Sequence, residues 1–142
     1  MEFAAFEKIV QECKSIKPIL FELEHDEILS ADEITEFENR FQIRLPEKYK
    51  TFLLKYGGGF FGYANVYSLD KNSSFYLLDH NDIPIGQYLR IADNGCGDHY
   101  LFRVDEQKCS EQVFFYEHDT KTVCSTGYAD ILEYLAKTGL KA

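Results

Sequence analysis

The residues best suited to chemistry lie between Ile91 and Val104, in the sequence IADNGCGDHYLFRV. A cysteine near a histidine can form a thiolate nucleophile with its base. The same thiol, with an imidazole and a carboxylate, can also bind a metal ion. Glycines on both sides of Cys96 suit a phosphate cradle or a tight turn between two strands. The segment therefore has four candidate roles: a catalytic loop, a metal site, a phosphate cradle and a turn.

The neighbouring sequence argues against catalysis by Cys96. A nucleophile elbow stands between a strand and a helix. The sequence HYLFRV, directly downstream, alternates as a strand does. Its two predicted faces carry Tyr100, Phe102 and Val104 on one side and His99, Leu101 and Arg103 on the other. Cys96 is thus expected in a turn between two strands, where an elbow does not occur.

Spacing argues against the metal and phosphate roles. A structural zinc site needs four ligands, usually in paired spacings, and the chain has neither CxxC nor HxxxH. The segments DKNSS and DHNDIP offer oxygen ligands without EF-hand spacing. The glycine-rich stretch GGGFFG, residues 57–62, follows a predicted helix and lacks the lysine of a P-loop. We therefore expect no metal and no cofactor, and interpret Asn94-Gly95 and Gly97-Asp98 as turn residues.

Length and composition indicate one domain over residues 1–142. A chain of 142 residues with 45% hydrophobic residues can bury its own core. Its four cysteines are scattered, as expected for small apolar side chains in a reducing compartment. The first residues do not resemble a signal peptide, and no apolar run is long enough to span a bilayer. The expected location is the cytoplasm, without membrane contact.

The charge balance narrows the choice of partner. The formal net charge is −9, whereas binding to phosphates requires clustered lysine and arginine. Direct binding of nucleic acid is therefore not expected. An acidic surface accelerates association with basic proteins, so a basic protein is a suitable partner.

Periodicity predicts helices around a run of strands. Apolar residues at helical spacing predict four helices, in residues 3–17, 29–41, 44–57 and 127–139. Extended segments are expected at 61–69, 74–78, 87–93, 99–104, 112–117 and 121–126. This order predicts an α+β fold, with a mostly antiparallel sheet of about five or six strands and with N-terminal helices and a C-terminal helix packed against it.

Three local signals fix expected helix ends. Ser30 and Glu33 have the spacing of a capping box. Pro46 suits the first turn of a helix, and Gly57 suits a C-terminal stop. The acidic sequence FELEHDE that precedes Ser30 is expected to be a surface loop.

Two motifs and the closing helix resemble the SUKH superfamily. The first motif is FENRFQIRLPEKYKTFLLKYGGG, residues 37–59, the second is the glycine turn, and the third is Thr126 through Leu135. The matching positions of the first two are Glu38, Leu45, Pro46, Tyr49, Phe52, Leu53, Gly57 and Gly58, then Ile91, Asn94, Gly95, Gly97, Asp98 and Tyr100. The chain departs from the pattern in YGGG, where many members have asparagine before the glycine pair, and in Cys96.

The resemblance implies a binding function without catalysis. Most members of the superfamily are bacterial immunity proteins that neutralise toxins, many of them nucleases. The resemblance therefore implies a cognate toxin as partner, with a basic nuclease domain, bound in a stoichiometric complex. We expect the protein itself to be a monomer or weak dimer. A minority resemble a regulator of cell-wall synthesis, so the alternative is a non-enzymatic regulatory or scaffold module of a housekeeping pathway.

Acidic and tyrosine side chains are the candidates for contacting the partner. Tyrosine contributes large contact area at low entropic cost. The candidates are Glu22, Glu24, Asp26, Glu27, Tyr63, Tyr67, Asp79, Asp82, Asp93 and Asp98. The competing interpretation is a solvated acidic face with the tyrosines in the core.

Overall fold

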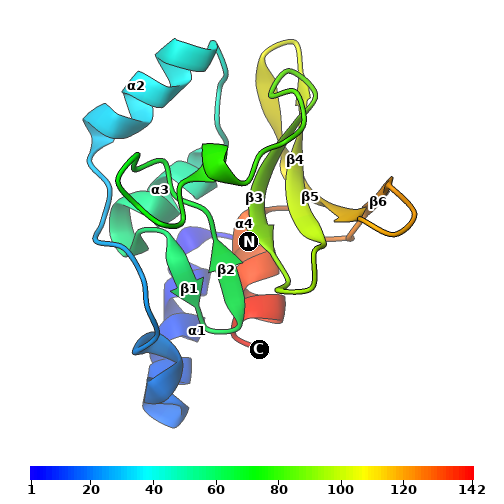
Figure 1. Cartoon of the computed structure of the whole chain (residues 1–142). Coiled ribbons are helices and arrows are strands. Elements are labelled where there is room, and N and C mark those ends of the chain that lie inside the picture. The colour runs from blue at the N-terminus through cyan, green and yellow to red at the C-terminus, as the bar shows by residue number, and fades with distance from the viewer.

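The sheet is a meander in which each strand pairs with the next one along the chain. The structure is a computed structural model that describes residues 1–142. All strand pairs are antiparallel, in the order β1-β2-β3-β4-β5-β6 (Figure 1). The strands are β1 (Gly59–Phe61), β2 (Ala64–Val66), β3 (Tyr88–Asp93), β4 (His99–Asp105), β5 (Lys108–Glu117) and β6 (Thr122–Ser125). The predicted α+β fold is confirmed.

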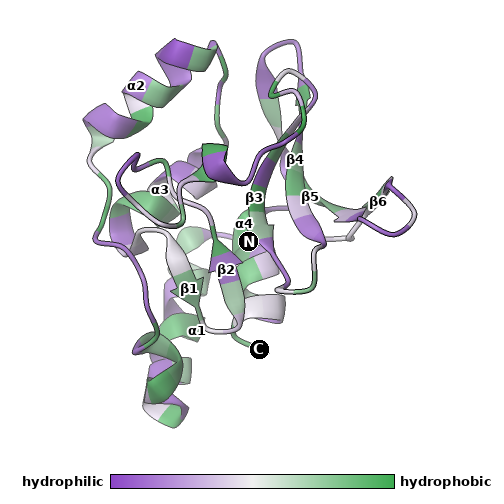
Figure 2. Ribbon diagram, viewed as in Figure 1, coloured by the Kyte–Doolittle hydropathy of each residue, from purple (hydrophilic) through white to green (hydrophobic).

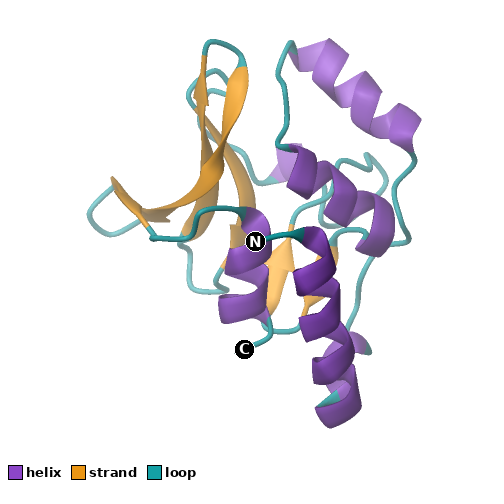
Figure 3. Cartoon of the chain, turned by 180° about the vertical axis from the view of Figure 1, so that it is seen from behind, coloured by secondary structure: helices purple, strands orange, loops and turns teal.

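Three helices from both ends of the chain cover one face of this sheet: α1 (Phe3–Ile16), α3 (Glu47–Tyr56) and α4 (Ile131–Tyr134), which continues as a π-helical turn, η3 (Leu135–Gly139). A fourth helix, α2 (Ala31–Phe41), stands to the side of the strands (Figure 1). Seen from behind, α1 and α4 stand in front of the strands (Figure 3). Short 3-10 helices occur at η1 (Pro18–Phe21) and η2 (Leu77–Asp79). None of the helices has the length and apolar character needed to cross a membrane.

Aromatic rings form the centre of the core. The rings of Phe6, Phe52 and Phe61 lie 5.1 to 6.4 Å apart, joining α1, α3 and β1. Tyr49 of α3 meets Phe102 of β4 edge to face at 5.6 Å. Burying each such side chain contributes roughly 1.5–3 kcal/mol. This packing holds α1 and α3 against β1 and β4.

The predicted helix ends agree with the structure, with one shift. Ser30 and Glu33 form the reciprocal capping box of α2. Gly57 ends α3 at φ 75°, a conformation that favours glycine. Pro46 is the residue before α3 instead of lying within its first turn. Asp130 caps α4 by accepting the backbone N–H of Glu133.

One predicted extended segment is wrong, and the acidic loop has a neighbour that the sequence did not predict. Residues 74–78 were expected to be a strand, but form a loop that leads into η2. Ser73 Oγ accepts the N–H of Phe75 there, and such side-chain bonds to the backbone compete with strand pairing. The acidic segment, expected to be a loop, lies along β1: the N–H of Phe60 donates to the carbonyl of Glu24 at 3.0 Å. This pairing covers the edge of the sheet.

Candidate protein-binding surfaces

The glycine-rich segment forms the turn between β3 and β4. Asn94 Oδ1 accepts the backbone N–H groups of Cys96 and Asp98. Gly95 and Gly97 have φ angles of 76° and 94°, which side chains strongly disfavour. Cys96 is exposed at the tip. The prediction of a strand–strand turn is therefore confirmed. Elsewhere the thiols differ, since Cys109 is buried as expected whereas Cys124 is exposed.

Asp98 holds this turn against the β5–β6 connection. Its Oδ1 accepts the backbone N–H of His118 at 3.0 Å and contacts His118 Nδ1 at 2.6 Å. These hydrogen bonds lower the pKa of Asp98 to about 2, and the bond to Asp98 raises the pKa of His118. The carboxylate is thus already paired within the chain.

A row of polar side chains crosses the sheet beside the turn. Asn65, Asp93, His99 and Tyr116 stand opposite one another on β2, β3, β4 and β5. Asp93 Oδ2 accepts the hydroxyl of Tyr67 at 2.7 Å and the amide of Asn65 at 3.1 Å. Asp93 therefore serves two donors of its own chain before any partner arrives.

The two candidate tyrosines have opposite environments. Tyr67 is completely buried, so its candidacy as a contact residue is wrong and the competing interpretation, a tyrosine in the core, holds for it. Its ring stacks on His80 at 4.3 Å, and burial raises the pKa of its hydroxyl. Tyr67 follows β2, where its N–H pairs with the carbonyl of Ile91 and the ring turns inward. Tyr63 in the β1–β2 turn is exposed, as expected.

The same region contains a buried arginine that the sequence motifs did not single out. Arg90 is 5% exposed, contacts Asp82 at 2.9 Å and lies over the ring of Tyr116. Its Nε and the Nδ1 of His99 are buried without a hydrogen-bond partner. Burial lowers the pKa of His99, and the charge of Arg90 lowers it further. The available signal was a charged residue inside the apolar strand YLRIA.

The row is suited to hydrogen bonding and shows no site for a metal ion. No group of three or more His, Cys, Asp or Glu side chains is placed to hold one. The unpartnered Nε of Arg90 and Nδ1 of His99 are buried, so neither faces a partner. The row therefore serves chiefly to hold the strands and the neighbouring loops together.

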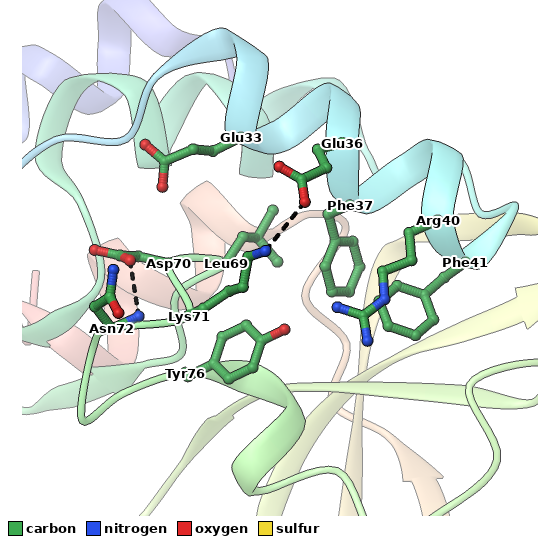
Figure 4. A pocket seen from close by; sticks show the side chains of 10 residues that line it. All are labelled: Glu33, Glu36, Phe37, Arg40, Phe41, Leu69, Asp70, Lys71, Asn72 and Tyr76. Atoms are coloured by element: carbon green, nitrogen blue, oxygen red, sulfur yellow. Dashed lines mark hydrogen bonds and ion pairs between the residues drawn. The ribbon is translucent and has the colours of Figure 1, made fainter.

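A small pocket lies between α2 and the loop that follows β2 (Figure 4). Phe37 and Tyr76 line it, and an ion pair of 3.2 Å between Glu36 and Lys71 closes one side. Its volume of about 90 Å³ is well below the roughly 300 Å³ of small ligand-binding pockets. This hollow suits a single side chain of a partner better than a substrate.

The predicted acidic contacts separate into paired and free carboxylates. Asp82, Asp93 and Asp98 are paired as described above, and Asp26 accepts the hydroxyl of Ser73. The remaining four carboxylates are exposed, and none forms an ion pair or a side-chain hydrogen bond: Glu22, Glu24, Glu27 and Asp79. Three of these four lie in one segment, which runs beside β1.

The comparisons with known proteins agree with this architecture. A family model described as SMI1 / KNR4 family (SUKH-1) matches residues 28–137. The chain belongs to this family. The matched residues include both SUKH motifs and nearly all of the closing helix. The superfamily resemblance drawn from the motifs is thus confirmed.

A solved structure extends the agreement to the fold. A crystal structure of a protein from Pseudomonas syringae pv. tomato superposes with a TM-score of 0.70 at 18% identity. The match covers 96% of this SUKH-1 chain and 99% of that chain. At this identity the likeness establishes the fold alone. Among curated proteins, none matches the sequence.

Proposed function

We propose that this SUKH-1 protein is an immunity protein that binds and neutralises a cognate bacterial toxin with a basic nuclease domain. Membership of the family over residues 28–137 carries the proposal. The net charge of −9 and the unpaired carboxylates of the acidic segment support it. The protein acts by occupying the toxin's surface and makes or breaks no bonds.

Electrostatics explains how such a complex inhibits a nuclease. A nuclease holds phosphates with lysine and arginine, and an acidic protein surface can take the place of the nucleic acid. Carboxylates at the rim chiefly accelerate association, which salt then slows. Apolar side chains at the centre supply most of the affinity.

A titration of toxin activity tests the proposal. Toxin domains encoded beside this gene are assayed for nuclease activity with increasing amounts of the protein. We expect inhibition to end at one protein per toxin, with association that slows as salt increases. Protection at far below one equivalent would instead indicate turnover and contradict the proposal. Cys96→Ser serves as a control, because a binding mechanism leaves its inhibition unchanged.

A further inference from the structure

Most of the exposed large apolar side chains belong to the stretch from the end of α1 to residue 28 and to β1, which lies along that stretch. Ile16 and Ile28 are 77% and 64% exposed. Five of the six exposed large hydrophobic residues of the chain belong to this region, namely Ile16, Ile19, Leu23, Ile28 and Phe60. Figure 2 shows hydrophobic residues on η1, which projects below the sheet. Isolated exposed apolar residues are common, whereas a cluster marks a contact surface.

A groove lies beside these residues, and Ile28 and Phe60 line it. It has a volume of about 460 Å³, and its apolar walls are Phe21 of η1, Ile28 just after the acidic segment, and Phe60 of β1. The glycines of the first SUKH motif form part of its wall at Gly57 and Gly58. Such a groove can accept one or two apolar side chains of another protein.

The charges around the groove favour a basic partner. Glu27 lines the groove, and Glu22 and Glu24 lie a few residues before it in the same segment. All three carboxylates are exposed and free. Two lysines also line the groove. Lys55 pairs with Glu7 at 3.1 Å, whereas Lys14 lies over the ring of Phe21 and keeps its charge. These lysines stand against Asp26 and Glu27 of the lining and the nearby carboxylates of Glu7, Glu22 and Glu24, so the balance of the region is negative.

We infer that this groove is the docking surface for a protein segment that presents apolar side chains flanked by lysine or arginine. This inference rests on the proposed function and names the part of the chain that receives the toxin. The apolar side chains enter between Phe21, Ile28 and Phe60. The flanking cations pair with the carboxylates of Glu22, Glu24 and Glu27.

A peptide titration followed by NMR tests the surface without a toxin. The probe is a capped peptide in which leucine alternates with lysine. Two comparison peptides carry glutamate for every lysine or serine for every leucine. We expect the leucine–lysine peptide to bind, with amide shifts centred on Ile28 and Phe60. We expect the other two to bind at least about tenfold more weakly, because each lacks one of the two required features.

Matched variants separate this groove from general charge attraction. Ile28→Ser, at an exposed position, and the triple variant Glu22→Gln, Glu24→Gln, Glu27→Gln should each weaken binding about tenfold. A triple variant with the same charge change at the opposite end of the molecule is the control. It carries Asp105→Asn, Glu106→Gln and Glu111→Gln on the β4–β5 hairpin, where all three residues are exposed. Its affinity should change less than about twofold.

The outcomes distinguish the surface from the function. An equal loss in the hairpin control, shifts centred elsewhere, or no binding of the leucine–lysine peptide would overturn the surface. One-to-one toxin inhibition that the Ile28→Ser variant and the acidic-segment triple variant leave unchanged would also overturn it, while the proposed function stands. Peptide binding at the groove with no toxin inhibited would overturn the function and retain the groove as a docking surface.

Discussion

Two acidic regions of this SUKH-1 protein have opposite environments. The aspartates around the glycine turn are engaged within the chain: Asp93 serves Tyr67 and Asn65, and Asp98 serves His118. The glutamates of the acidic segment, 22–27, are free and lie beside an apolar groove. The glycine-turn region resembles an active site in sequence, but its polar groups maintain the fold. The acidic segment has the sequence of an ordinary surface loop, yet its charged groups remain available.

The difference shows that residue type alone is a poor guide to function in this chain. A carboxylate that already accepts two or three hydrogen bonds has little capacity left for a partner. A carboxylate without partners beside exposed apolar side chains combines the charged rim and the apolar centre of an interface. Whether a carboxylate still has free hydrogen-bonding capacity therefore distinguishes a contact residue from a structural one.

The largest effect on the unfolding free energy is expected from replacing one glycine in each of the two regions, Gly59 beside the acidic segment and Gly95 in the glycine turn. A Cβ at Gly59 would lie 2.6 Å from the backbone of His25, at a φ of 101°. At Gly95, φ is 76° and the surrounding space is open. Gly95→Ala should cost about 1–2 kcal/mol from backbone strain. Gly59→Ala should cost about 3 kcal/mol, because it also displaces the acidic segment. Urea unfolding of both variants checks this order, and equal losses would contradict it.

A smaller effect is expected when carboxylates of the two regions are removed. Asp93→Ala leaves the buried hydroxyl of Tyr67 without its acceptor, which should lower the unfolding free energy by about 2 kcal/mol. Glu24→Ala, with a free side chain, should change it by less than about 0.5 kcal/mol. The double variant Asp93→Ala with Tyr67→Phe should recover part of the loss, since the unpaired hydroxyl is then absent. Additive losses would mean that the hydrogen bond is not the cause.

The smallest effect concerns the ion pair of the glycine turn. The pKa of His118 is raised by Asp98, so its contribution to stability is complete below the unfolded pKa of about 6.5 and is lost as pH rises through the folded pKa. The pKa of Asp98 is about 2, so its contribution is present above pH 4 or so and is lost as pH falls toward about 2. Asp98→Asn should return the pKa of His118 toward its ordinary value in an NMR titration. An unchanged pKa would exclude the pairing in solution.

Much of the architecture could be predicted because it depends on local signals. Ser30 and Glu33 cap α2 as their spacing requires, and Gly57 ends α3. The strand–strand turn at Asn94 and Gly95 follows from turn chemistry within five residues. The prediction of an extended segment at residues 74–78 was wrong because it relied on their apolar content. It gave too little weight to Ser73, whose side chain bonds to the backbone and favours a turn.

The candidate surfaces could be predicted only in part, because whether a side chain is exposed and unpaired depends on residues far apart in sequence. Sequence alone determined the α+β fold, the family and the acidic character of the chain, since these follow from periodicity, motifs and composition. Only the tertiary structure decided that Tyr67 is buried, that Asp98 meets His118 twenty residues away, and that the acidic segment lies along β1. The physical reason is that hydrogen bonding and burial depend on which strands become neighbours, and no local pattern specifies those neighbours.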